Sequence, residues 1–385
     1  MYPTISDLLK DLFGINIPLP VQSFGFMLAI SFLCAAWTLM LELKRKEQQG
    51  LLSASTIKVL KGAPATSVEL ITSGIVGFLI GFKLVYVILN YTEFVNDTQG
   101  TILSSKGSFW GGVLFAAASA YLRYREKEKQ KLPEPKWEDE IVLPNQLVGN
   151  LTMVAAVAGL LGAKIFHNLE NLDEFAADPF DALISFSGLT MYGGLICGGT
   201  AVIWYGTKHG IPFRHLLDST APGLMLAYGT GRLGCQLSGD GDWGIVNHIS
   251  KPGWLNFLPD WAWAYSYPHN VNSVGIPIAG CEGRHCMVLP EPVFPTPLYE
   301  AIVCISLFFV LWCYRKKIST PGILFCIYLL MNGVERFFIE KIRVNTKYHI
   351  FGNAITQAEI IAVCLVILGI IGIYYFRKNK MHAKN

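Results

Sequence analysis

The sequence predicts an all-α, multi-pass membrane protein with about nine transmembrane helices. Of its 385 residues, 52% are hydrophobic and only 15% are charged, whereas soluble proteins carry about 25% charged residues. Long apolar segments recur along the chain, and basic residues gather in alternate connecting loops. This composition excludes a soluble enzyme and a disordered chain. The net charge of +3 also argues against a nucleic-acid partner.

Nine apolar segments are candidates to cross about 30 Å of hydrocarbon. The third is short and the sixth is comparatively polar. The first is followed by Lys44, Arg45 and Lys46 and has no basic segment before it, so we expect a retained span rather than a cleaved signal peptide. The nine segments are 21–41, 67–90, 108–122, 147–168, 184–206, 216–237, 298–314, 321–340 and 358–376.

The loops indicate which side of the membrane each end of the chain occupies. Basic residues gather in loops 42–66, 123–146 and 207–215 and in the C-terminal tail. Loop 169–183 has five acidic residues and no Lys or Arg. Because cytoplasmic loops carry an excess of Lys and Arg, the N-terminus is predicted outside and the C-terminus in the cytoplasm.

The long loop 238–297 is then external. It is rich in tryptophan and tyrosine, which favour the membrane interface, and we expect a small folded cap there; a direct role in binding substrate is the alternative. Cys281 and Cys286 could form a disulfide in an oxidising compartment. A metal site with His269 and His285 is the weaker alternative, since the spacing matches no known metal signature. We therefore predict no metal.

Two stretches of the chain resemble each other. Residues 74–90 and 155–171 are both apolar, rich in small residues, and carry a lysine in register. An aromatic-Gly-Gly sequence follows each, as Trp110-Gly111-Gly112 and Tyr192-Gly193-Gly194. Small residues allow close packing of helices in lipid. We interpret 50–135 as a duplicated helix pair with a basic loop, inserted into a single membrane domain spanning 1–385; chance similarity is the alternative.

Charged residues at the depth of a span cost about 3 kcal/mol each, so they indicate function. Arg232 precedes a glycine-rich segment that contains Asp240. Arg336, Glu340 and Arg343 have the i, i+4, i+7 spacing of one helix face. All lie in the predicted outer half of the membrane, which favours a polar chamber that handles an anionic lipid. Anchoring at the head groups and a purely structural ion pair remain alternatives.

Two further residues lie at the same predicted depth. Tyr192, at the outer start of its span, precedes two glycines that would let either a lipid or a neighbouring helix come close. Glu300 begins the span at 298–314, where a carboxylate stabilises the helix N-terminus. We assign Glu300 no chemistry from the sequence.

At these residues the chain resembles bacterial prolipoprotein diacylglyceryl transferases. The family's Gly-Arg-x-Gly-Asn-x-x-Asn-x-Glu-x-x-Gly pattern resembles 231–244, with one residue inserted before Gly244. Its Arg-Phe-x-x-Glu-x-x-Arg motif matches 336–343, its His-Gly-Gly-Leu-Ile-Gly motif resembles 192–197, and its Gln-Leu-Tyr-Glu-Ala motif resembles 297–301. Phe24 stands at a family tyrosine. The resemblance covers the first span and roughly 147–377.

The resemblance implies transfer of the diacylglyceryl group of phosphatidylglycerol to the lipobox cysteine of a prolipoprotein, with release of glycerol phosphate. It implies no cofactor and a place in the bacterial cytoplasmic (inner) membrane. We expect Arg232 to hold the phosphate, Arg336 to assist it or to favour the thiolate, Glu340 to orient Arg336, and Asp240 to position the loop or the glycerol. The remaining expected substrate contacts are Gly193, Gly194, Gly234, Gly244, Arg343 and Phe24.

The chain also departs from the family pattern. Tyr192 stands where the family has a histidine, and an unperturbed tyrosine, with a pKa of about 10, is a poor base at neutral pH. Either Tyr192 only hydrogen-bonds the lipid or another group, such as His269, takes the proton. Cys235 and Ser238 replace two asparagines. A lipid transporter or flippase, and an inactive lipid-binding paralogue, are therefore the alternative functions.

Overall fold

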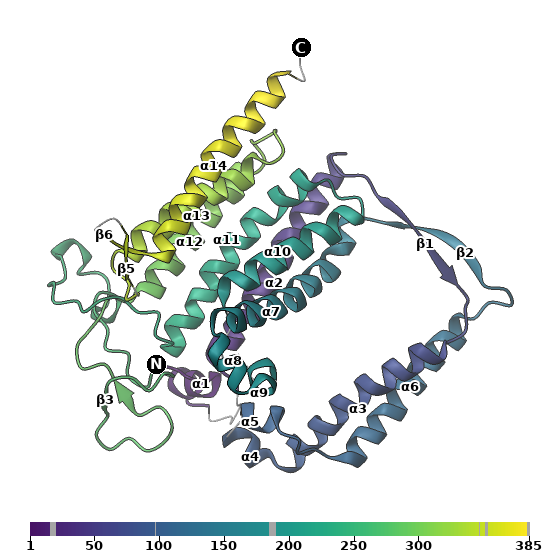
Figure 1. The fold of residues 1–385 in the computed structure, drawn as a ribbon, viewed down its shortest axis with the longest axis horizontal. Coiled ribbons are helices and arrows are strands. Elements are labelled where there is room, and N and C mark those ends of the chain that lie inside the picture. Colours follow the sequence, from purple (N-terminus) through teal and green to yellow (C-terminus); the bar gives the residue numbers. More distant parts are fainter. Residues whose placement is uncertain (16–20, 97, 185–189, 346, 351–352, 383–385) are drawn as a thin grey trace. The chain divides into compact units, whose positions relative to one another are not determined.

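The structure, a computed structural model, describes the chain except residues 16–20, 97, 185–189, 346, 351–352 and 383–385. The chain divides into two compact units, which are described separately (Figure 1). The first comprises Met1–Leu52, Pro144–Thr152 and Ile203–Asn385, and the second comprises Ser53–Leu143 and Met153–Val202.

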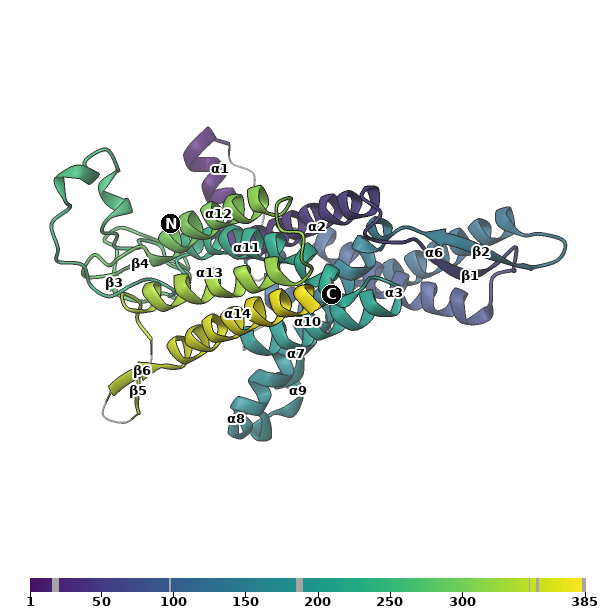
Figure 2. The same ribbon diagram turned by 90° about the horizontal axis from the view of Figure 1, so that it is seen from above.

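The first unit is a bundle of long helices. In both views (Figures 1 and 2), α11 runs among α2, α12 and α13, and α13 lies beside α14. The core between α11, α12 and α13 contains Met225, Phe308 and Leu324. The helices are α1 (Ile5–Phe13), α2 (Ser23–Gln48), α11 (Phe213–Ser238), α12 (Thr296–Tyr314), α13 (Ile323–Glu340) and α14 (Gln357–His382).

Local sequence sets the ends of the two helices that carry the arginines. Gly239, at φ 64°, ends α11 in the left-handed conformation that glycine adopts at little cost. At the other end of the bundle, the Asp218 carboxylate accepts hydrogen bonds from the backbone N–H groups of Gly322 (2.8 Å) and Phe325 (2.9 Å) at the start of α13. This contact ties the start of α13 to α11.

The segment between α11 and α12 folds around a small core of its own. Tyr267 is fully buried there with Trp243, Leu289 and Val293. The disulfide that the sequence left open is present between Cys281 and Cys286. The regular elements of this segment are η2 (Gly253–Leu255), η3 (Asp260–Ala262) and the hairpin of β3 (Ile276–Pro277) with β4 (Met287–Val288). We call residues 239–295 the cap.

Two helical hairpins with the same order of elements make up most of the second unit, and residues 144–152 and 203–208 of the second hairpin belong to the first unit. Each has a long helix, two short helices and a second long helix. The first comprises α3 (Ser67–Leu89), α4 (Tyr91–Asn96), α5 (Thr98–Leu103) and α6 (Phe109–Gln130); the second comprises α7 (Val148–Glu170, preceded by η1, Pro144–Leu147), α8 (Leu172–Ala177), α9 (Pro179–Ile184) and α10 (Met191–Lys208).

Equivalent positions of the two hairpins make the same hydrogen bonds. The Ser108 N–H donates to the Phe82 carbonyl (2.8 Å), and the Thr190 N–H donates to the Ala163 carbonyl (3.1 Å). The side-chain amide of Asn90 caps α3 on the Tyr86 carbonyl (3.1 Å). The amide of Asn171 does the same in α7, on the His167 carbonyl (3.0 Å). These shared contacts support the interpretation of a duplication.

The glycines of both hairpins hold the long helices close together. A Cβ added to Gly111 would lie 2.8 Å from the Gly81 carbonyl oxygen, and one added to Gly193 would lie 2.5 Å from the Gly162 carbonyl oxygen. Both distances are shorter than a carbon–oxygen contact allows. Glycine is therefore required at the same place in each hairpin.

Each of the nine predicted spans contains helical residues, and among the residues that the structure describes five helical segments, fewer than the nine predicted, are long and apolar enough to cross a membrane. These five are α2, α3, η1 with α7, α12 and α14. Large apolar side chains along them are exposed, for example Leu33, Leu79 and Ile371, as expected for helices that contact lipid. The start of the predicted span 184–206 lies partly outside the described residues.

The all-α prediction is incomplete in the connecting segments. β1 (Ser55–Lys61) pairs with β2 (Lys136–Val142), and β5 (Lys347–Ile350) pairs with β6 (Asn353–Thr356), both antiparallel. Lys61 and Glu138 form an ion pair across the first of these ribbons (3.2 Å). The sequence analysis counted the lysines of these segments only as topology signals, although alternating β-branched residues favour strands.

Candidate functional site

One buried carboxylate organises the polar site where α11, α12 and α13 meet. Glu300, in the first turns of α12, is 0% exposed. Its Oε2 lies 2.5 Å from Arg232 Nε and 3.7 Å from Arg336 Nη1, and its Oε1 lies 3.3 Å from Arg343 Nη1. The Tyr228 hydroxyl also donates to Oε2 (2.7 Å). This role of Glu300 was not predicted from the sequence, although the need to balance three arginines could have indicated it.

The sequence of α11 brings its arginine to this carboxylate. Tyr228 and Arg232 are four residues apart, and the guanidinium of Arg232 lies 5.2 Å from the centre of the Tyr228 ring. Gly229 lies between them, and a Cβ there would be 3.1 Å from the backbone nitrogen of Ile305. The missing side chain lets α12 approach closely enough for Glu300 to reach Arg232.

An acidic residue of the cap completes the pairing of two arginines. The carboxylate of Asp242 pairs with Arg232 through one oxygen and with Arg343 through the other, and it is 31% exposed. Thr296 holds the backbone, because its hydroxyl donates to the Asp242 carbonyl (2.8 Å). The preceding Gly241 has φ 95°, which glycine adopts readily.

Asp242, and not Asp240, is the acid that meets the arginines. Asp240 instead supports the loop: its Oδ1 accepts from the Asp242 N–H (3.4 Å) and its carbonyl accepts from the Asn272 side chain (2.7 Å). This agrees with the loop-positioning role that was one expectation for Asp240. The acid that pairs with the arginines thus lies two positions beyond the one that the linear motif indicated.

The end of α13 supplies the other two arginines in different ways. Arg336 and Glu340 form the expected i, i+4 ion pair (3.2 Å). The i+7 prediction is wrong, because α13 ends at Glu340 and Arg343 lies in the turn beyond it. A backbone bridge with Gly244 holds that turn, and a Cβ on this glycine would lie 2.6 Å from the Ile342 carbonyl oxygen. The close approach of two backbones therefore places Arg343.

The other glycine and aromatic residues predicted to bind substrate pack against the protein. A Cβ on Gly234 would lie 3.0 Å from Met27 Cβ and 3.4 Å from Phe24 Cα, so Gly234 lets α11 approach α2. Phe24 itself is 40% exposed. Gly193 and Gly194, in α10, face α7, where a Cβ on Gly194 would lie 3.2 Å from the Gly159 carbonyl. The sequence left open whether a lipid or a neighbouring helix approaches these two glycines, and the structure shows a neighbouring helix.

Of the two candidate bases, one belongs to the second unit and the other to the cap. Tyr192 begins α10 in the second unit, where it is half-buried. In the cap, His269 Nδ1 is bonded to the His285 carbonyl (2.8 Å) and lies 3.9 Å from Cys281 Sγ, so this nitrogen is engaged in the hairpin. Burial lowers the pKa of His285, which therefore favours its neutral form. Neither histidine is joined to an arginine of the site by a described contact.

Several polar atoms of the site have no hydrogen-bond partner within the described residues. They include Nη1 of Arg336, Nε of Arg343 and both carboxylate oxygens of Glu335. Leaving a buried donor or acceptor unpaired costs roughly 1–3 kcal/mol. The site therefore has capacity to bind an additional anionic or hydrogen-bonding group.

One group of potential metal ligands adjoins the site. The Sγ of Cys235 and carboxylate oxygens of Asp240 and Asp242 lie within 4.8 Å of one another. However, Asp242 is already paired with two guanidinium groups, whose positive charges would repel a cation. The residues present therefore suit an anion better than a metal ion.

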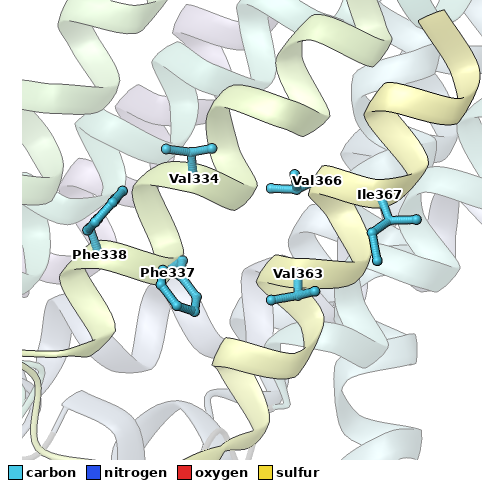
Figure 3. A pocket seen from close by; sticks show the side chains of 6 residues that line it. All are labelled: Val334, Phe337, Phe338, Val363, Val366 and Ile367. Carbon is cyan, nitrogen blue, oxygen red and sulfur yellow. The ribbon is translucent and has the colours of Figure 1, made fainter. Parts of the chain in front are cut away.

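The opposite face of α13 is apolar. Val334, Phe337 and Phe338 line a groove with Val363, Val366 and Ile367 of α14 (Figure 3). A groove of this lining accepts hydrocarbon but cannot hold a charged head group. α13 thus separates an apolar surface from the arginine site.

Fold and site together define a multi-pass helical membrane protein with an arginine-rich anion site buried in its bundle. Comparison with known families extends this description. The chain belongs to the prolipoprotein diacylglyceryl transferase family, because the model of that family's sequences matches residues 10–144 and residues 134–375.

Three similar proteins carry the name phosphatidylglycerol–prolipoprotein diacylglyceryl transferase. The protein of Corynebacterium diphtheriae is 30% identical over 230 residues, covering 58% of this chain and 76% of the relative. The protein of Pseudomonas paraeruginosa is 25% identical over 282 residues, covering 71% and 92%. The protein of Vibrio campbellii is 26% identical over 296 residues, covering 76% and 95%.

Proposed function

We propose that this protein transfers the diacylglyceryl group of phosphatidylglycerol to the lipobox cysteine thiol of a prolipoprotein and releases glycerol phosphate. The observation that carries this proposal is the group of three arginines around Glu300, with buried guanidinium N–H groups still unpaired. The relatives are named for these two substrates.

The arginines suit the chemistry of the leaving group. The departing phosphate gains negative charge in the transition state, and preorganised N–H donors stabilise such charge most effectively in a dry site. Arg232 and Arg343 together can offer paired hydrogen bonds to phosphate oxygens. Arg336 stands beside them, and its Nη1 makes no hydrogen bond within the described residues, so it can donate to a third phosphate oxygen or favour a thiolate. Glu340 holds Arg336 in place.

The same proposal includes the topology. The protein has nine spans in one bacterial cytoplasmic-membrane domain, with 50–135 as an inserted helix pair, the N-terminus and cap outside, and the C-terminus in the cytoplasm. Support comes from the basic residues of alternate loops and from the Cys281–Cys286 disulfide, since the outer compartment is oxidising. This orientation places the arginines where a lipobox cysteine arrives.

The decisive experiment measures product directly. The purified protein is placed in vesicles of phosphatidylglycerol with a lipobox peptide, and mass spectrometry detects a diacylglyceryl gain on the cysteine. We expect the gain with phosphatidylglycerol and none with phosphatidylethanolamine vesicles. Arg232→Gln should abolish it without unfolding the protein. A folded wild-type protein that gives no gain would refute the transferase function and favour lipid transport or binding.

A further inference from the structure

Glu335 is a buried carboxylate that the proposed chemistry has not yet used. It lies on α13 next to Arg336 and is 8% exposed. Neither of its oxygens has a hydrogen-bond partner among the residues that the structure describes. Glu300 and Glu340, the neighbouring acids, are each bound to arginines. Glu335 therefore differs from them in having both oxygens available to a ligand.

The surroundings of Glu335 belong to the arginine site. The charged and titratable groups that interact electrostatically with it are Arg336 on its own helix, Arg232 and Tyr228 on α11, and Glu300 and Cys304 on α12. Two arginines and one other carboxylate are thus within electrostatic range of it. An ionisable side chain at this depth in a membrane is costly and is retained chiefly for function. A bound group that donates a proton or hydrogen bond would satisfy it.

The transfer reaction requires such an acceptor. The cysteine must become a thiolate before it attacks carbon. Tyr192 is a phenol where the family resemblance leads one to expect a histidine, and an unperturbed phenol, with a pKa of about 10, is a poor base at neutral pH. Glu300 and Glu340 are paired with guanidinium groups. Among the buried glutamates of the described site, Glu335 is the one with neither oxygen paired or hydrogen-bonded, so it is available to take a proton.

We propose that Glu335 is the general base that removes the proton from the substrate thiol, an inference that rests on the proposed transferase function. The thiol proton moves to a Glu335 oxygen, and the sulfur then forms a bond to the glyceryl carbon that carries the phosphate. The carbon–oxygen bond to the phosphate breaks, and its electron pair stays on that oxygen. Glycerol phosphate leaves with the proton that Glu335 held, which restores the carboxylate.

The position beside Arg336 gives this base a consistent electrostatic setting. Arg336 and Arg232 partly offset the cost of ionising Glu335; once it is protonated, the same arginines stabilise the thiolate and the departing phosphate. The positive charges are therefore used at each stage without a rearrangement of the helices. Such preorganisation is the main source of electrostatic catalysis.

The test uses Glu335→Gln, which keeps the shape of the side chain and removes the base. We expect turnover of the cysteine peptide to fall by about 100-fold or more, the usual contribution of a general base, with the KM for phosphatidylglycerol within about twofold of wild type. Glu359→Gln is the matched control, because Glu359 is a buried glutamate on α14 whose carboxylate pairs with Lys341 (2.5 Å), away from the arginines. It should keep turnover within about twofold.

A peptide with selenocysteine in place of the lipobox cysteine makes the test specific. A selenol is more acidic than a thiol and is largely ionised at neutral pH, so it does not need the base. We expect the selenocysteine-to-cysteine rate ratio of Glu335→Gln to exceed that of wild type by about tenfold or more. Because the ratio is measured on one preparation, it does not depend on how much of the variant is folded. Glu335→Asp, which keeps a carboxylate, should restore part of the cysteine rate.

The possible results separate the two proposals. An active wild-type enzyme with an unaffected Glu335→Gln variant, or with a variant whose rate ratio equals that of wild type, would overturn the role of Glu335 alone. A folded wild-type protein that modifies neither peptide would overturn the transferase function, and the role of Glu335 with it.

Discussion

Asp242 binds two of the arginines to which the proposed function assigns the substrate phosphate. Its two carboxylate oxygens bind Arg232 and Arg343, the same two guanidinium groups that would hold a phosphate. Asp242 belongs to the cap and is 31% exposed, whereas Glu300 is fully buried, so Asp242 is the acid that can swing out when lipid enters. Asp242→Asn should therefore remove an internal competitor and lower the KM for phosphatidylglycerol.

The size of the expected change in KM follows from the hydrogen bonds that the Asp242 carboxylate loses when it leaves the arginines. Hydrogen bonds to charged groups contribute roughly 1.5–3 kcal/mol each, and two are lost when Asp242 leaves. The released carboxylate regains water, and partly exposed ion pairs contribute only about 0–1 kcal/mol. The free energy by which Asp242 opposes phosphate binding is therefore about 1–2 kcal/mol. Removing it corresponds to a KM for phosphatidylglycerol that is roughly 5- to 30-fold lower.

The assay measures initial rates against the mole fraction of phosphatidylglycerol in neutral vesicles. Asp260→Asn is the matched control, because Asp260 is also a cap aspartate with a cationic partner, Lys251 (2.6 Å), but contacts no arginine of the site. Its KM should equal that of wild type. An unchanged or higher KM for a folded Asp242→Asn variant would refute the reasoning and show that Asp242 aligns the arginines instead.

Three other predictions concern residues outside the arginine cluster. Tyr192→Phe should keep at least about half of the wild-type turnover, since an unperturbed phenol is a poor base; a loss above tenfold would assign its hydroxyl a chemical role. Replacing Cys281 and Cys286 with serine should speed proteolysis of the cap hairpin, because the disulfide restricts the unfolded hairpin. An unchanged rate of cleavage would show that the apolar core of the cap protects the hairpin without the disulfide. Gly162→Leu should lower thermal stability and turnover by separating α7 from α10, whereas Gly81→Leu should lower stability but keep about half of the turnover; equal losses of turnover would mean that both hairpins serve catalysis.

The sequence predicted the helices well where the physics is local. The segment predicted at 67–90 is α3 (Ser67–Leu89), and the one at 298–314 is α12 (Thr296–Tyr314). In a membrane every backbone group must be hydrogen-bonded within the protein, so an apolar stretch of sufficient length has few alternatives to a helix. The similarity of the two hairpins was also visible in the sequence, because close helix packing requires small residues at particular positions.

The site was predicted only in part. Arg232, Arg336 and Glu340 were predicted from their cost at span depth and from helical spacing, and the structure brings them together around Glu300 or beside it. The sequence favoured Asp240 over Asp242, assigned Glu300 only to its helix N-terminus, and gave Glu335 no role. Spacing of i, i+4 can show that Arg336 meets Glu340 on one helix. It carries no information on where α13 ends, and the end of that helix moved Arg343 into a turn.

By itself, therefore, the sequence determined the membrane class, the helical segments and the kinds of charged residue available, because these depend on composition and on local hydrogen bonding. Only the tertiary structure decided which acid meets which arginine. Arg343 pairs with Asp242, 101 positions away, and with Glu300, 43 positions away. Those meetings depend on how closely glycines let helices and loops approach, which is a property of the packed bundle and not of any one segment.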